Sequence, residues 1–172
     1  EALHHTYPDL PVLGCVLRDQ QLDLPSRHLG LVQATETRDL DRFLDSAADK
    51  LSREIDIDWL IQLAKPCTLT HTNKNPPALM PLGQRIGVTQ DAAFAFIYPH
   101  IIDGWRKAGA EIHPFSPLGG DTIPPTVDAV FLPGGYPELH AATLAASPFL
   151  PSLQAAAKAG TKIYGECGGY MV

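Results

Sequence analysis

The 172-residue sequence has few cysteines, no long apolar run and no dense basic cluster, and each shortage removes a class of protein. Its three cysteines, Cys15, Cys67 and Cys167, are odd in number and far apart, so they form neither a disulfide framework nor a zinc site. A reducing compartment, the cytoplasm, is therefore expected. The apolar runs are too short to span a membrane. A formal net charge of −6 without a Lys/Arg cluster argues against nucleic acid or an anionic membrane surface as a partner.

A proline-rich stretch, residues 65–84, divides the sequence into two parts of different texture. It shows no hydrophobic period and is typical of a linker. Before it, the apolar run Val12–Leu17 predicts a buried strand, and the i, i+3, i+4 spacing over Asp39–Ile55 predicts an amphipathic helix. Asp56 or Asp58 is expected to cap a second, short helix.

Residues 85–172 alternate short apolar strands with helices. We expect strands at Arg85–Thr89, Ala110–Phe115, Ala129–Leu132 and Thr161–Gly165, and helices at Phe94–Ala108, Leu139–Ala146 and Phe149–Ala159. This alternation predicts an α/β fold with a parallel, doubly wound sheet. Binding sites in such sheets lie beyond the carboxyl ends of the strands. Two glycine pairs, Gly134-Gly135 and Gly168-Gly169, stand at such ends.

The second glycine pair follows the cysteine that the sequence marks most clearly as a nucleophile. The run Gly165-Glu166-Cys167-Gly168-Gly169 joins an expected strand to an expected helix start. A thiol on such a turn stands clear of the sheet, and the flanking glycines let a substrate approach. The N–H groups and dipole of a following helix favour the thiolate form. Because α/β-hydrolases use the same G-x-[nucleophile]-x-G pattern, acyl transfer and ester hydrolysis both stay open.

The first glycine pair is either a plain strand-ending turn or part of an oxyanion hole. In the second interpretation the N–H groups of Gly135 and Gly168 share the negative charge that develops on a substrate oxygen. Gly134, Tyr136 and Glu138 are candidates for substrate contact, and Glu138 is also a candidate helix cap.

No residue has a local signature as the general base for the thiol. Glu166 is expected to point to the other face of the strand end. His140 follows the Gly-Gly turn closely enough to reach the site, and none of the seven histidines stands at a metal-ligand spacing, so no metal site is predicted. In the first part of the chain, Arg27 and His28 lie in a loop that either binds an anion or faces solvent.

Three blocks together resemble the cobyrinic acid and hydrogenobyrinic acid a,c-diamide synthases, glutamine amidotransferases of cobalamin biosynthesis. The first is Arg27–Leu31, the second is Asp91–Tyr98, and the third pairs Phe131–Glu138 with Tyr164–Gly169. These blocks cover most of the chain in the order of the family. Cobyric acid synthases match less well because they usually lack the Gly-Gly-Tyr-Pro-Glu form, whereas a nickel-sirohydrochlorin diamide synthase is also similar.

The resemblance implies two domains in the intact enzyme. A P-loop domain uses ATP and Mg²⁺ to activate the a- and c-acetate carboxylates of the corrinoid macrocycle. A class I glutamine amidotransferase domain, flavodoxin-like in architecture, uses Cys167 to attack the side-chain amide of glutamine. Residues 1–64 then belong to the tail of the synthetase domain, with the Arg27-His28 loop at its site, 65–84 form the linker, and 85–172 begin the glutaminase domain. A homodimer is compatible with the resemblance.

The sequence departs from the family pattern in two places. It has no G-x-x-x-x-G-K-[ST] loop, the family's ATP phosphate site, and no residue matches the family's downstream histidine, the base for Cys167. We therefore expect an internal fragment that is inactive as an amidotransferase by itself. Two other functions remain open: a cysteine hydrolase of the dienelactone type, which needs neither glutamine nor ATP, and a non-catalytic module in which Cys167 senses redox state.

Overall fold

The computed structural model describes residues 2–26, 32–68 and 79–172, and the chain divides into two compact units, Glu1–His71 and Thr72–Val172. The predicted Arg27-His28 loop and half of the predicted linker, residues 69–78, lie outside the described residues. The domain limits 1–64, 65–84 and 85–172 therefore stay predictions. None of the helices in the described ranges has the length and hydropathy that a membrane span requires.

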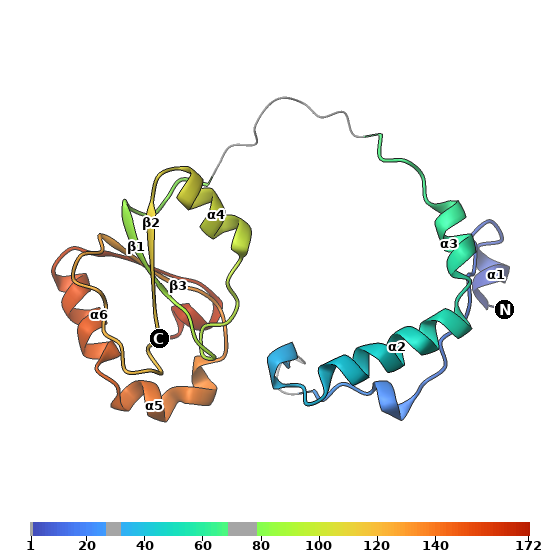
Figure 1. Cartoon of the computed structure of the whole chain (residues 1–172), viewed down its shortest axis with the longest axis horizontal. Helices are drawn as coiled ribbons and strands as arrows, with labels where there is room; N and C mark the ends of the chain where they lie inside the picture. Colours follow the sequence, from blue (N-terminus) through green and yellow to red (C-terminus); the bar gives the residue numbers. More distant parts are fainter. Residues whose placement is uncertain (1, 27–31, 69–78) are drawn as a thin grey trace. The chain divides into compact units, whose positions relative to one another are not determined.

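The first unit is built from helices (Figure 1). They are α1 (Ala2–Thr6), the 3₁₀ helices η1 (Gln20–Leu22) and η3 (Ala34–Glu36), α2 (Leu40–Glu54) and α3 (Ile57–Leu63). Helix α2 confirms the predicted amphipathic helix. Asp56 caps α3, as one of the two predicted caps, by accepting the N–H of Trp59 at 2.8 Å. No described side chain of α2 or α3 is fully buried, and the apolar stripe of α2 is only partly covered: Phe43 is half-buried, whereas Leu44 is exposed.

The buried strand predicted at Val12–Leu17 is wrong. The backbone there forms one isolated antiparallel bridge, between Gly14 and Ile55, and Cys15 is exposed. A β-carbon on Gly14 would lie 2.9 Å from the Cα of Ile55, so the glycine permits the close approach. An apolar run forms a buried strand only where neighbouring strands and a covering layer exist, and in this unit the segment pairs with the end of a helix instead.

An ion-pair cluster joins this segment to α2. Lys50 Nζ lies 3.2 Å from Asp19 Oδ2 and 3.0 Å from Glu54 Oε1. Hydrogen bonds from the N–H of Gln21 and from Lys50 hold the pKa of Asp19 below its ordinary value. Hydrogen bonds from Lys50 and from the N–H of Leu17 lower the pKa of Glu54, and the bonds to Glu54 and Asp19 raise the pKa of Lys50.

We expect the first unit to lose stability at both ends of the pH scale. The two carboxylates contribute stability that is present above their ordinary pKa, about 4, and is lost as the pH falls through their lowered values. The Lys50 ammonium contributes stability that is present below its ordinary pKa, about 10.4, and is lost as the pH rises through its raised value. In Lys50→Met, the free energy of unfolding of this unit should fall less at both acid and alkaline pH. Urea titrations that follow the NMR signals of α2 at each pH measure it. Lys158→Met, an exposed lysine of the second unit, is the control, and an unchanged fall at acid pH in Lys50→Met would contradict the prediction.

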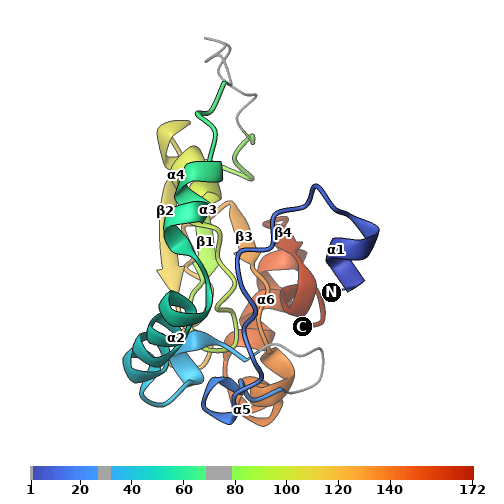
Figure 2. The same cartoon turned by 90° about the vertical axis from the view of Figure 1, so that its right-hand side faces the viewer.

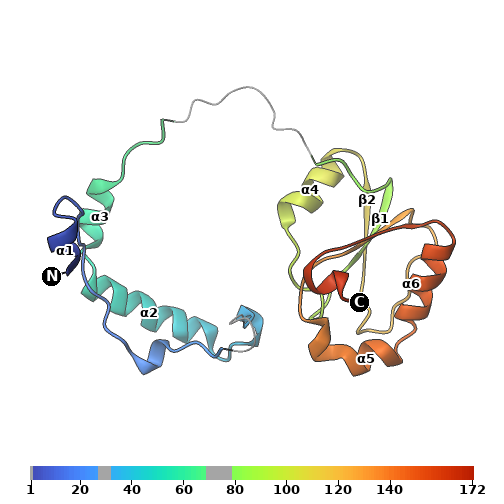
Figure 3. The same ribbon diagram turned by 180° about the vertical axis from the view of Figure 1, so that it is seen from behind.

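The second unit is the predicted α/β domain with helices on both faces of a parallel sheet (Figures 1 and 3). Its strands are β1 (Arg85–Thr89), β2 (Glu111–Phe115), β3 (Ala129–Leu132) and β4 (Lys162–Gly165), and its helices are α4 (Pro99–Lys107), η4 (Pro137–His140), α5 (Ala141–Ala146), α6 (Phe149–Lys158) and η5 (Cys167–Tyr170). The strands lie in the order β2-β1-β3-β4, which can be followed across Figure 2, and every pair is parallel.

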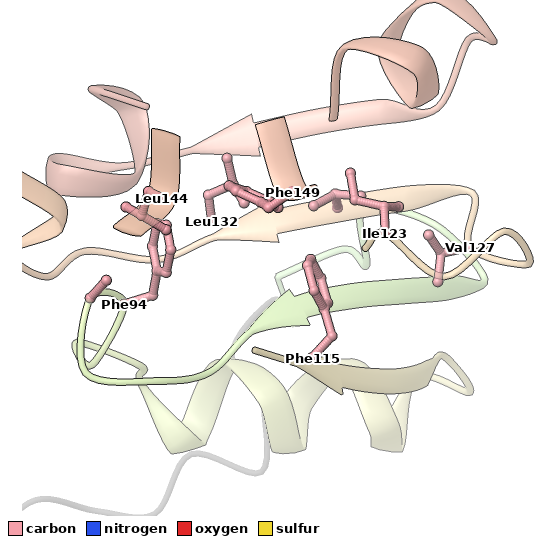
Figure 4. Packing of buried hydrophobic residues seen from close by; sticks show 9 residues of the cluster. Phe94, Phe115, Ile123, Val127, Leu132, Leu144 and Phe149 are labelled. Atoms are coloured by element: carbon pink, nitrogen blue, oxygen red, sulfur yellow. The ribbon is translucent and has the colours of Figure 1, made fainter. Parts of the chain in front are cut away.

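The two hydrophobic clusters of this unit lie on opposite faces of the sheet. All four residues of β3 are buried, and its alternate side chains enter different clusters. Phe131 packs edge-on against Trp105 of α4, with 5.5 Å between the ring centroids. Leu132 joins the cluster around Phe149 of α6 (Figure 4). Burial on both faces is typical of an inner strand of a parallel sheet and confirms the predicted fold class.

The helix predicted at Phe94–Ala108 begins only at Pro99. The residue before a proline is kept out of the helical region, and Tyr98 is accordingly extended, with φ −93° and ψ 105°. Pro99 itself suits the first turn of α4. The segment before it is left outside the helix, and the N–H of Phe96 donates to the carbonyl of Gly134 at 2.9 Å.

Candidate active site

The carboxyl ends of β1, β3 and β4 meet where the strand order reverses. The chain runs from β1 outward to β2, then crosses to β3 and β4 on the other side of β1. Doubly wound sheets bind their ligands at such a switch point. The loops that follow these three strands carry Ala93–Phe96, Gly134–Tyr136 and Cys167–Gly169.

Cys167 is held in a left-handed backbone conformation with φ 50°. A residue with a β-carbon rarely adopts this conformation, which costs about 1–3 kcal/mol. The turn is fixed by hydrogen bonds from the N–H of Glu166 to the carbonyl of Leu132, at 3.1 Å, and from the N–H of Gly169 to the carbonyl of Glu166, at 2.8 Å. Cys167 is exposed. The predicted tight turn after the strand, a nucleophile elbow, is therefore present. Its strained backbone conformation is that of Cys167, the predicted nucleophile.

The helix start that the sequence predicts after β4 is present as a 3₁₀ helix. The 3₁₀ helix η5 follows β4, and Cys167 is its first residue. That a following helix favours the thiolate form of Cys167 stays a prediction.

Two glycine turns pack backbone against backbone beside the thiol. A β-carbon on Gly168 would lie 2.5 Å from the carbonyl oxygen of Gly135 and 2.6 Å from Cδ of Pro137. One on Gly134 would lie 3.1 Å from Cβ and 3.4 Å from Sγ of Cys167. In the part of the chain that the structure describes, neither the Gly135 nor the Gly168 N–H donates a hydrogen bond. Two unpaired donors beside a thiol match what an oxyanion hole requires.

The loop after β1 forms a third wall of the site, which sequence reasoning missed. The ring of Phe96 lies edge-on to that of Tyr136, with 5.4 Å between centroids. A β-carbon on Gly135 would lie 2.8 Å from the carbonyl carbon of Ala93. Pro99 was the signal in the sequence that could have indicated this wall. It starts α4 late, so the residues before it form a loop beside the Gly134-Gly135 turn.

The other predicted site residues are less directly involved. Tyr136 is only 5% exposed, and its ring lines the wall against Phe96. Glu138 is exposed in the first turn of η4 and is not its cap, because Tyr136 occupies that position. Across the described ranges, no hydrogen bond or ion pair joins His140 to Cys167.

The fold and the elbow together define a class I glutamine amidotransferase-like domain. Residues 85–172 match the family model of the CobB/CobQ-like glutamine amidotransferase domain, just over half of the chain. The chain therefore belongs to the CobB/CobQ-like glutamine amidotransferase family, and the resemblance seen in the sequence is confirmed.

The chain is also similar to proteins named hydrogenobyrinate a,c-diamide synthase. It is 51% identical over 164 residues to the one from Brucella anthropi, which covers 95% of this chain and 38% of the relative. It is 50% identical over 163 residues to the one from Mesorhizobium japonicum, covering 95% and 37%. The chain thus spans about 38% of the length of the curated relatives it matches. No solved structure matches the chain.

Proposed function

We propose that this chain carries the glutaminase nucleophile of an ATP-dependent a,c-diamide synthase that acts on cobyrinic or hydrogenobyrinic acid. The observation that carries the proposal is the strained Cys167 beside the unpaired N–H groups of Gly135 and Gly168. Membership of the amidotransferase family favours this chemistry over an ester hydrolase or a redox-sensing module. The names of the relatives favour the cobalt-free substrate.

The site supports attack on the side-chain amide of glutamine. The Cys167 thiolate bonds to the amide carbon, and the carbonyl electrons move onto oxygen, where the N–H groups of Gly135 and Gly168 stabilise the charge. Each such donor is worth roughly 3 kcal/mol. Gly134 lacks a side chain and so leaves space beside Sγ. Collapse breaks the C–N bond, and the nitrogen takes up a proton and leaves as ammonia. Water then hydrolyses the thioester to glutamate and frees the thiol.

The ammonia would then attack the a- and c-acetate carboxylates after their activation with ATP, giving the two amides. The described residues do not fit an ATP and Mg²⁺ site. The sequence has no phosphate-binding loop, and in the described ranges no group of three or more His, Cys, Asp or Glu residues is arranged to hold a metal ion. We assign activation of the carboxylates to another part of the enzyme. We expect the enzyme to act in the cytoplasm, and we propose that it forms a homodimer.

Cys167 is expected to be the first of the three thiols to react with a diazo-ketone analogue of glutamine. All three cysteines are exposed, so exposure alone does not distinguish them. Cys167 lies beside Gly134 and next to the Gly168 turn, where the unpaired N–H groups of Gly135 and Gly168 are the proposed oxyanion donors. Mass spectrometry after partial labelling measures the order, and iodoacetamide, which lacks the α-amino and α-carboxyl groups of glutamine, should label all three. Equal labelling of Cys67 by the analogue would contradict the assignment.

The 172-residue polypeptide by itself is expected not to turn over glutamine. A cysteine without a paired base keeps some nucleophilicity, so a strong electrophile traps it although repeated proton transfer fails. The measurement is ammonia release from glutamine, with Cys167→Ala as the blank. Sustained release above that blank would show that a residue of this chain is the base, and loss of that release in His140→Ala would identify it.

A further inference from the structure

A half-buried carboxylate in the loop after β1 accepts three hydrogen bonds. Asp91 Oδ1 accepts the N–H of Ala93 at 2.9 Å, and Oδ2 accepts the N–H of Leu118 at 2.9 Å and the hydroxyl of Ser116 at 3.1 Å. The hydroxyl of Ser116 itself accepts the N–H of Gly119 at 2.9 Å, so its own proton is directed to Asp91. Asp91 thereby ties the loop after β1 to the turn after β2.

The loop after β1 that Asp91 holds also contacts the Gly134-Gly135 turn. The N–H of Ala93 is held by Asp91, while its carbonyl abuts Gly135. Ala93 is fully buried, so this contact has little room to shift. Three residues later in the same loop, the N–H of Phe96 donates a hydrogen bond to the carbonyl of Gly134. The peptide that joins Gly134 to Gly135, whose N–H is the proposed oxyanion donor, is thus in contact with a loop whose other end Asp91 holds.

The three donors require an acceptor on both oxygens. A carboxylate accepts at either oxygen, whereas an amide has one acceptor and one NH₂ donor. Asn at this position places its NH₂ against the N–H of Leu118 and the hydroxyl of Ser116, or against the N–H of Ala93. In either orientation at least one tie is lost, although the side chain keeps its size.

We propose that Asp91 is a positioning residue for glutamine recognition, which acts through Ala93 on the Gly135 peptide and does not touch the substrate. This role rests on the proposed glutaminase function. The matched control is Asp128, whose two oxygens accept the N–H of Arg85 at 3.1 and 3.2 Å at the opposite, amino end of β1. Asp128→Asn makes the same substitution away from the site, where the remaining amide oxygen can still accept the single N–H of Arg85.

The test compares two alkylations of Cys167 in the whole chain. With the diazo-ketone analogue of glutamine, the thiol bonds to the diazo carbon, dinitrogen leaves and the thiol proton ends on that carbon. With iodoacetamide, the thiol displaces iodide. The ratio of the two rate constants reports recognition and not general accessibility. Asp91→Asn should lower this ratio about tenfold, less than loss of an oxyanion donor, because the donor is displaced and not removed. Asp128→Asn should leave the ratio unchanged.

A second readout does not depend on the glutaminase function. The amide NMR signals of Gly135 and Phe96 should shift in Asp91→Asn and stay in place in Asp128→Asn. Unshifted signals, or an unchanged labelling ratio in a folded Asp91→Asn chain, would overturn the role of Asp91. If wild-type Cys167 shows no preference for the analogue, the proposed function fails, while the Gly135 shift still decides whether Asp91 positions the turn. If Asp91→Asn does not fold, Ser116→Ala is the second variant, because it removes one of the three donors to Asp91. It should lower the ratio of the two alkylation rate constants by a smaller factor. An unchanged ratio in Ser116→Ala would count against the positioning role of Asp91.

Discussion

Replacing Cys167 with Ala in the full-length enzyme should abolish glutamine-dependent amidation and leave ammonia-dependent amidation intact. The thiol only liberates ammonia from glutamine, whereas carboxylate activation belongs to another part of the protein, so free ammonia bypasses the loss. The measurement is diamide formation with either glutamine or an ammonium salt as the nitrogen donor.

Cys67→Ala is the matched control, because Cys67 is also exposed and is not part of any described strand or helix. It should leave both activities unchanged. Loss of ammonia-dependent amidation in a folded Cys167→Ala enzyme would contradict the division between the two half-reactions.

Gly135→Val is expected to lower glutamine turnover by roughly 100-fold or more, as loss of one oxyanion donor does in related chemistry. A side chain there meets the carbonyl group of Ala93, with the β-carbon 2.8 Å from the carbonyl carbon, and it must push the Gly-Gly turn away from the loop. The measurement is kcat/KM for glutamine in the full-length enzyme, with ammonia-dependent activity as the check that the fold survives.

Gly104→Val provides the comparison, because a β-carbon on Gly104 would meet no atom within 4 Å. Its glutamine turnover should stay near that of the wild type. A near-normal rate in Gly135→Val would mean that the Gly-Gly turn is only the end of β3 and not part of the catalytic site.

The strands of the second unit could be predicted from the sequence, whereas the one predicted in the first unit was wrong, and the difference has a physical reason. Strands β1 and β3 begin and end as predicted, because an inner parallel strand is covered on both faces and reads as a continuous apolar run. Val12–Leu17 has a similar composition, but the described residues of its unit offer it no neighbouring strand, and it makes one isolated bridge there. Composition identifies an apolar segment but not what covers it.

The sequence by itself determined the elbow at Cys167, because a tight turn between glycines after a short apolar strand depends on local backbone geometry. It also indicated the family, through motifs that stay in order along the chain. Only the tertiary structure showed that the loop carrying Asp91 and Ala93 meets the Gly135 turn. These residues are far apart in sequence. They meet because β1 pairs directly with β3, Val88 beside Phe131, so that two strands separated along the chain by β2 end next to each other.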